Sequence, residues 1–323
     1  MRTVPAAIPA ALPQAWRGET YHGRPVVKAS SFDWKVSTYI VLQGIAGSAQ
    51  IIAAVAGAGS SRSRSLVRQA RLLALFGGTV GPLILVQHLK TPRRWYNMLR
   101  IVRPTSPMSL GSWLLTGFGA LSGLLALGEL RGHRWPLLRR VADTAQVPAA
   151  VAGAGMSVYT AALLASTSTP LWATAPRSLG AQFGAASMAG AASALALLQR
   201  ISGETASARR LEELAMVAAA GELLASQATE RRWRRAGIAE PVHTGTVGAL
   251  HQGGGKLVGV ALPLAAHALG RLVGGRAGEV LPVAASIGMV LGGAALRHAV
   301  LLGGNESACR PRDAFRVTQE VRR

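Results

Sequence analysis

The stretch VSTYIVLQGIAGSAQIIAAVAGA, residues 36–58, decides the fold of this chain. It carries no charged side chain, and as a helix it is long enough to cross about 30 Å of hydrocarbon, which takes about 20 residues. Across the whole chain 50% of residues are hydrophobic, only 15% are charged and the mean hydropathy is positive, which is more apolar than a soluble domain needs. Lipid is therefore the expected solvent for most of the chain.

Seven further apolar runs resemble the first. The eight predicted spans cover residues 36–58, 70–88, 111–128, 145–165, 178–199, 212–229, 256–271 and 280–302. They are rich in Ala, Gly, Ser and Leu, as expected for helices that pack closely in lipid. We predict an all-α integral membrane protein with about eight transmembrane helices in two four-helix bundles. Its expected parts are an N-terminal tail and interfacial segment (1–34), the transmembrane domain (35–302) and a C-terminal tail (303–323), and residues 1–20 are expected to be loose.

The strong positive charge fits a membrane topology better than nucleic-acid binding. Of the 35 lysines and arginines, all but Arg297, which lies inside the last span, are assigned to the two membrane faces, and no basic motif with interleaved aromatic residues occurs. We define the tail face as the face that holds both termini and the connectors after the second, fourth and sixth spans. It carries the larger share of the cations, so the positive-inside rule predicts that both termini are cytoplasmic in a multi-pass protein of the cell membrane. No cleavable signal sequence is expected.

The connector that follows the second span is the most distinctive one. Residues 88–113 contain three prolines, two tryptophans and five cations: Lys90, Arg93, Arg94, Arg100 and Arg103. This pattern predicts a docking or ligand surface at the tail face. Five tryptophans fall near span ends, where we expect them to anchor the interface rather than stack on a ligand: Trp34, Trp95, Trp113, Trp135 and Trp172.

Because successive spans alternate in direction, several polar side chains should meet at the tail face. They are Tyr39, Gln43, His88, Tyr159, Arg297 and His298. Phenols, imidazoles and an amide at a polar–apolar boundary are the donors and proton carriers that a quinone site needs. For Tyr39 and Gln43 an ordinary helix–helix hydrogen bond is an equal alternative.

The sixth span carries a carboxylate, Glu222, near its middle. An ionisable group at this depth usually pairs or carries protons, so Glu222 is a candidate proton relay or, alternatively, a structural partner of Arg297. His267 in the seventh span is a weaker candidate. The single cysteine, Cys309, cannot form an intramolecular disulfide or hold an iron–sulfur cluster, and any such cluster must belong to a partner.

Ordered motifs along nearly the whole chain point to one family. They are residues 21–28 (YHGRPVVK) with Trp34 and Tyr39, residues 89–94 with 97–100 (NMLR), residues 105–113 (TSPMSLGSW), residues 159–164 (YTAALL), residues 169–172 (TPLW) and residues 297–308. With these the chain resembles the NrfD-like membrane subunits of polysulphide reductase and related molybdopterin oxidoreductases.

The resemblance implies a fold of two four-helix bundles that holds no haem or iron–sulfur cluster of its own. It also implies exchange of quinone or quinol, either menaquinone or ubiquinone, and electron transfer to or from a docked ferredoxin-like iron–sulfur subunit. That subunit would serve a molybdopterin-type catalytic subunit.

Tyr39 matches a first-span position that is a quinone-contacting His in some members, and Tyr159 matches the quinone-contacting Tyr of the fourth span. In departure from the family pattern, Val36 replaces an Asn, His88 stands where an acidic residue is usual, and Gln43-Gly44 replaces a Gly pair.

Two non-redox alternatives stay open. A transporter is consistent with Glu222 and with the helix breaks at Gly81-Pro82 and Leu262-Pro263. These breaks do not fall at matching places in the two halves, and a transporter does not explain the basic connector. The other alternative is a passive membrane anchor, because the acidic residue usual in the family is missing.

Overall fold

The computed structural model describes residues 26–59 and 64–320, and within these ranges the chain is helical with no strand. The elements are α1 (Trp34–Gly57), α2 (Arg64–His88), the 3-10 helix η2 (Pro92–Leu99), α3 (Pro107–Arg131), α4 (Pro136–Thr144), α5 (Gln146–Ala165), α6 (Pro170–Ala173), α7 (Pro176–Ile201), α8 (Thr205–Arg235), η3 (Glu240–Val242), α9 (Gly245–Gly248), the π-helix η4 (Ala249–Ala261), α10 (Leu262–Val273), α11 (Gly275–Cys309) and α12 (Pro311–Glu320). The expected loose tail, residues 1–20, and the start of the 21–28 motif lie outside the described residues.

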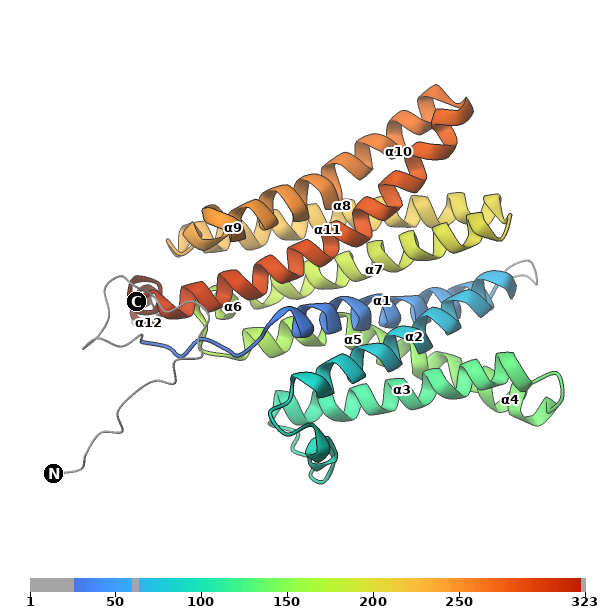
Figure 1. The fold of residues 1–323 in the computed structure, drawn as a ribbon, viewed down its shortest axis with the longest axis horizontal. Helices are drawn as coiled ribbons and strands as arrows, with labels where there is room; N and C mark the ends of the chain where they lie inside the picture. The colour runs from blue at the N-terminus through green and yellow to red at the C-terminus, as the bar shows by residue number, and fades with distance from the viewer. Residues whose placement is uncertain (1–25, 60–63, 321–323) are drawn as a thin grey trace.

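The long helices lie roughly side by side along one direction (Figure 1). In the described part of the chain seven helical segments are long and apolar enough to cross a membrane: α1, α2, α3, α5, α7, the continuous segment Gly245–Val273 and α11. This confirms the predicted all-α membrane fold. The predicted sixth span lies inside α8, which packs along α7 but does not belong to the seven apolar segments. The chain is therefore a multi-pass membrane protein.

The long helices form two groups of four. One consists of α1, α2, α3 and α5, and the other of α7, α8, the Gly245–Val273 segment and α11. The groups meet where α7 packs on α1 and α5, and where α11 packs on α1. The predicted pair of four-helix bundles is thus present. The last helix continues beyond the predicted end of its span at residue 302, as far as Cys309.

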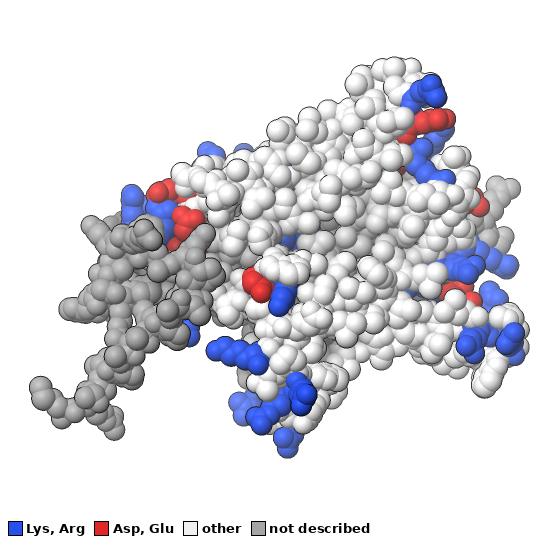
Figure 2. Space-filling model, in the orientation of Figure 1, with Lys and Arg blue, Asp and Glu red and all other residues white. Residues whose placement is uncertain are grey.

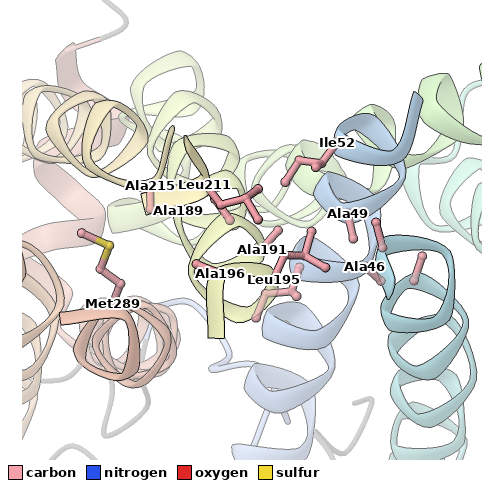
Figure 3. Packing of buried hydrophobic residues seen from close by; sticks show 14 of the residues in the cluster. Ala46, Ala49, Ile52, Ala189, Ala191, Leu195, Ala196, Leu211, Ala215 and Met289 are labelled. Atoms are coloured by element: carbon pink, nitrogen blue, oxygen red, sulfur yellow. The ribbon is translucent and has the colours of Figure 1, made fainter. Parts of the chain in front are cut away.

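Small side chains allow the helices to approach closely. A Cβ on Gly47 of α1 would collide with the carbonyl oxygen of Gly153 on α5, and the reverse also holds. Between η4 and α11, a Cβ on Gly259 would lie 2.9 Å from the Cα of Gly292. Where α1, α7, α8 and α11 meet, the core consists mainly of alanine and leucine side chains (Figure 3). Packing of small residues therefore sets the helix spacing, as expected for helices that associate within lipid.

A buried polar network joins α1, α2, α3 and α5 at the end opposite the tail face. Arg71 donates from Nε to Gln146 Oε1 at 2.8 Å and forms ion pairs with Glu129 at 2.6 Å and Asp143 at 3.2 Å. Gln146 in turn donates to the side-chain oxygen of Gln50 at 3.1 Å. Every nitrogen of this guanidinium has an acceptor, so removal of one partner would leave a buried charge uncompensated and destabilise this end of the first bundle.

At the tail face the segment before α1 lies against the end of α11. Ser30 donates from both its backbone and its hydroxyl to Asn305 Oδ1, at 3.1 and 2.6 Å. Asp33 caps α1 by accepting from the backbone N–H of Lys35 at 3.0 Å, and α12 lies at the same end of the molecule (Figure 1). The N-terminal approach to the bundle is therefore fixed by polar contacts.

Trp172 does not have the interfacial position that the sequence predicted. It is fully buried in α6, its indole N–H donates to the Val300 carbonyl at 2.8 Å, and it packs so closely on Gly304 that a Cβ there would collide with the ring. The prediction failed because α6 folds inward between the bundles instead of ending at the surface. Trp34, Trp95, Trp113 and Trp135 are exposed, as expected of interface anchors.

Candidate functional site at the tail face

Two predicted imidazoles each have a partner on α1 or its cap. His88, the last residue of α2, lies with Nδ1 3.2 Å from the Asp33 carboxylate. His298 of α11 lies with Nδ1 3.0 Å from the hydroxyl of Ser37. These contacts place titratable groups on both sides of the start of α1, where protons can be exchanged with water.

The two predicted tyrosines have different surroundings. Tyr39 is buried among the apolar side chains around Ile40 and Phe183, and its hydroxyl has no hydrogen bond within the described ranges. Tyr159 of α5 donates its hydroxyl proton to the Pro107 carbonyl at 3.0 Å, and it occupies the space left by Gly111, where a Cβ would collide with the ring. The phenols are near enough to interact electrostatically. Tyr159 therefore ties α5 to the first turn of α3, directly after the basic connector.

Gln43 lies one turn below Tyr39 on the same face of α1. It is fully buried, and its Nε2 donates to the Gly77 carbonyl at 3.1 Å, whereas its Oε1 has no hydrogen-bond partner. The close approach of α2 requires Gly81, because a Cβ there would lie 2.8 Å from Gln43 Nε2. The predicted helix–helix hydrogen bond is present, but it leaves one acceptor free.

Arg297 lies deeper than the surface residues, between the two bundles. It is only 1% exposed and donates to Gly293 O at 3.1 Å, Phe183 O at 3.1 Å and Ser187 Oγ at 2.8 Å. Its guanidinium also lies 5.5 Å from the centre of the Phe183 ring. A Cβ on Gly44 would lie 3.3 Å from its NH2 atom. Arg297 thus connects α11 to α7 beside α1, and does not line the surface with the two histidines.

Glu222 is the predicted carboxylate in the second bundle. It is 4% exposed and near enough to Arg297 to interact electrostatically, but the two do not form an ion pair within 4.0 Å. Among the buried polar side-chain atoms of this bundle without a hydrogen-bond partner are those of Gln182 on α7 and of Ser226, one turn further along α8. The second bundle therefore holds polar groups that are not fully satisfied by one another.

The basic connector forms an exposed loop on the tail face. Lys90, Arg93, Arg94, Arg100 and Arg103 are all exposed, and none forms an ion pair with another described residue. The serines of the 105–113 motif shape the loop, because Ser106 caps α3 by accepting from Ser109 N at 3.4 Å, and Ser109 Oγ donates to Ile101 O at 3.1 Å. Lysine and arginine side chains gather at the loop (Figure 2). We call residues 90–103 the basic loop.

Comparison with protein families matches residues 21–307 to the polysulphide reductase family, NrfD. The chain belongs to the NrfD family. No curated protein matches it. NrfD proteins are membrane subunits of oxidoreductase complexes that also contain catalytic and iron–sulfur subunits, so this chain is such a membrane subunit.

The candidate site contains residues that inspection of the sequence did not single out. Ser37 and Asp33 hold the two histidines, and Asp33 was recognisable as a helix cap because it directly precedes an apolar helical run. Gln182 stands out in its apolar run as a lone amide, but nothing in the sequence shows that both of its polar side-chain atoms lack a partner.

The side chains of α1 in this NrfD protein fit the chemistry of a quinone. A quinone carbonyl needs a donor, which the Tyr39 hydroxyl can supply, and a quinol hydroxyl needs an acceptor, which Gln43 Oε1 can supply. Both groups lie on one face of α1 and neither has another partner for that role among the described residues.

Proposed function

We propose that this NrfD subunit exchanges quinone and quinol at the tail face and passes electrons between the membrane quinone pool and a docked iron–sulfur subunit, which in turn serves a molybdopterin-type catalytic subunit. One observation carries the proposal: Tyr159, which is near enough to Tyr39 to interact with it electrostatically, donates to Pro107 at the start of α3, the helix that the basic loop leads into. A ligand there would lie close to a partner bound on the loop.

The proposed roles follow from the atoms that are free. Tyr39 donates to one carbonyl of the quinone, and Gln43 Oε1 accepts from a hydroxyl of the quinol. Tyr159 positions the quinone ring next to the start of α3. Oxidation of a quinol releases two protons and two electrons. His88 with Asp33 and His298 with Ser37 take the protons toward water at the tail face, and the electrons go to the cluster of the docked subunit. Arg297 supports the site by fixing α11 and α7 beside Gly44.

The basic loop is proposed to bind an acidic surface of the iron–sulfur subunit. Its five cations are exposed and unpaired within the described residues, so they can attract an oppositely charged partner at long range. The positive-inside rule favours a cytoplasmic position for this face and the cell membrane as the location of the chain. Association should weaken as salt rises, because exposed charges are screened beyond about 10 Å at 0.1 M ionic strength.

The test is quinol-linked electron transfer by the intact complex in native membranes. Tyr39→Phe and Tyr159→Phe should each lower the rate with quinol at least tenfold and leave activity with an artificial electron carrier at the catalytic subunit unchanged. Thr38→Val is the matched control, since its hydroxyl bonds only to Trp34 O within α1. Wild-type quinol rates in both tyrosine variants would overturn the site.

Proton movement through the second bundle is a separate proposal. Glu222, with Ser226 one turn further along α8 and Gln182 on α7, offers exchangeable groups inside the membrane. Glu222→Gln should abolish proton movement in sealed vesicles beyond the two protons that each oxidised quinol releases, while electron transfer continues. If the same chain alone carried solutes or ions into liposomes, the transporter alternative would replace this account. An inserted chain that supports the catalytic subunit but no quinol reaction would instead be a passive anchor.

A further inference from the structure

A second polar site lies at the end of the molecule away from the tail face. A cleft of about 680 Å³ opens between the end of α7 with the start of α8 and the hairpin of α10 and α11. In Figure 1 this hairpin diverges from the ends of α7 and α8, and Figure 2 shows that basic and acidic side chains gather there. We call it the arginine cleft. Its volume lies in the range of small-molecule sites, roughly 300–1,000 Å³.

The arginine cleft has cations that its own carboxylates do not neutralise. Arg200 pairs with Glu212 at 2.6 Å, and Arg271 pairs with Glu213 at 2.9 Å. The other two lining arginines, Arg209 and Arg276, are exposed and form no ion pair with any described residue. Glu279 is the one further carboxylate of the lining. The cleft therefore offers two uncommitted guanidinium groups to an anion.

A buried histidine in the wall gives an independent indication of a ligand. His267 of α10 lines the cleft and is only 2% exposed, yet its Nε2 has no hydrogen-bond partner. A buried polar atom without a partner costs free energy, so such atoms in folded proteins usually have an acceptor or donor supplied by something else. An anion seated between Arg209 and Arg276 would give Nε2–H an acceptor.

The surroundings of the cleft show which kind of anion fits. Beside the cations, the end of α10 presents apolar side chains to the outside: Leu269, Leu272 and Val273 are 50, 84 and 60% exposed. In a membrane these side chains face acyl chains, while the arginines lie at the level of the head groups. Gly274 and Gly275, both with positive φ (65° and 56°), turn the hairpin without side chains that would fill the entrance.

We propose that the arginine cleft binds the phosphate group of an anionic phospholipid. Arg209 and Arg276 bind the phosphate oxygens, His267 Nε2 donates to the same group from the wall, and the acyl chains run along Leu269, Leu272 and Val273. Free inorganic phosphate has the same head chemistry without the chains, so the two sources must be separated by experiment. This site is independent of the proposed quinone reaction at the other end of the molecule.

The test measures lipid retention by the full-length chain in its complex. Delipidated complex is placed in nanodiscs of phosphatidylcholine with or without phosphatidylglycerol, and bound lipid is counted by native mass spectrometry after release. The double variant Arg209→Gln/Arg276→Gln should retain at least fivefold less phosphatidylglycerol than wild type. The matched control Arg139→Gln/Arg140→Gln removes the same charge from exposed positions at the same end of the first bundle and should retain the wild-type amount.

Two results would overturn the proposal. One is equal retention of phosphatidylglycerol by wild type and the double variant. The other is that millimolar inorganic phosphate displaces the lipid and raises the unfolding temperature of the complex as much as phosphatidylglycerol does. That result would make free phosphate the ligand. His267→Phe provides a second variant that keeps both arginines, and it should lower phosphatidylglycerol retention about threefold if Nε2 contacts the head group.

Discussion

Arg297 illustrates what single residues contribute to this protein. Its guanidinium is 1% exposed and binds two carbonyls and a hydroxyl on α11 and α7. Arg297→Met should lower the free energy of unfolding by roughly 3 kcal/mol, because the Phe183 carbonyl and the Ser187 hydroxyl lose a charged donor. Thermal unfolding in detergent measures this. Arg139→Met, at an exposed site, should change stability little, and equal losses in both variants would contradict the assigned role.

Asp313 lies on α12, outside the membrane spans, and should make the stability of α12 depend on pH. Burial raises the pKa of Asp313 to about 6 from its ordinary 3.8, against the opposing effect of Arg310. The folded state therefore holds the proton more tightly than the unfolded state, so the contribution of this group to stability is full below about pH 4 and is lost as the pH rises through 6. Hydrogen exchange of α12, corrected for intrinsic rates, should show more protection at pH 5 than at pH 8.

Two variants test whether the Asp313 carboxyl causes this pH dependence. Asp313→Asn should remove the pH dependence of α12 protection, while Glu204→Gln, at an exposed carboxylate of the opposite end, should keep it. Protection of α12 that rises from pH 5 to pH 8 in wild type would show that the carboxylate is stabilised as an anion instead.

Residue types could be recognised from the sequence, but their partners could not. The tyrosines, histidines and Arg297 stood out because polar groups are rare in apolar runs. Arg297 proved to bind Phe183 O and Ser187, which are far away in the sequence, and only the packing of α11 on α7 brings them together. Whether the tail-face set acts on a quinone stays a prediction.

At the scale of elements, glycine pairs set the distances between helices. Gly47 of α1 and Gly153 of α5 touch backbone to backbone. Gly47→Ala or Gly153→Ala should separate these helices and lower the unfolding temperature by several degrees, since neither neighbour can yield. Gly123→Ala on α3 is the control: nothing lies within 4 Å of its added Cβ, and alanine favours the helix by about 1 kcal/mol. Equal destabilisation by all three would contradict the packing argument.

Helix α8 is the element whose role most needs a direct test. It runs alongside α7 but is not among the seven apolar segments, because it carries Glu212, Glu213 and Glu222. If α8 spans the membrane, Ala206→Cys and Arg231→Cys, both at exposed positions, should be labelled by a membrane-impermeant thiol reagent from opposite sides in a Cys309→Ala background. Labelling of both from one side would show that α8 does not cross.

The existence of the long helices could be predicted because each apolar run must cross the same hydrocarbon thickness. Their ends could not, since helix α8 continues beyond residue 229 to Arg235, where Arg234 pairs with Glu230 within the helix. Nor did periodicity reveal the inward turn of α6 that buries Trp172, because that turn depends on the space left by Gly304.

At the scale of the whole molecule, the two ends carry different polar groups. The tail face carries the basic loop and the contact of Tyr159 with Pro107, and the opposite end carries the Arg71 network and the arginine cleft. Family membership makes the chain a membrane subunit of an oxidoreductase complex. That assignment fits an exposed loop with unpaired cations, which a chain acting alone would not need.

The central claim is that quinol electrons leave through a partner docked at the basic loop. The most direct measurement is to purify the tagged chain from its native membrane in mild detergent and to follow the visible absorption of the complex when a quinol is added. We expect a co-purifying iron–sulfur subunit whose absorption bleaches with quinol in wild type and at least tenfold more slowly in Tyr159→Phe. An iron–sulfur partner that an artificial reductant bleaches but quinol leaves unchanged would contradict the claim.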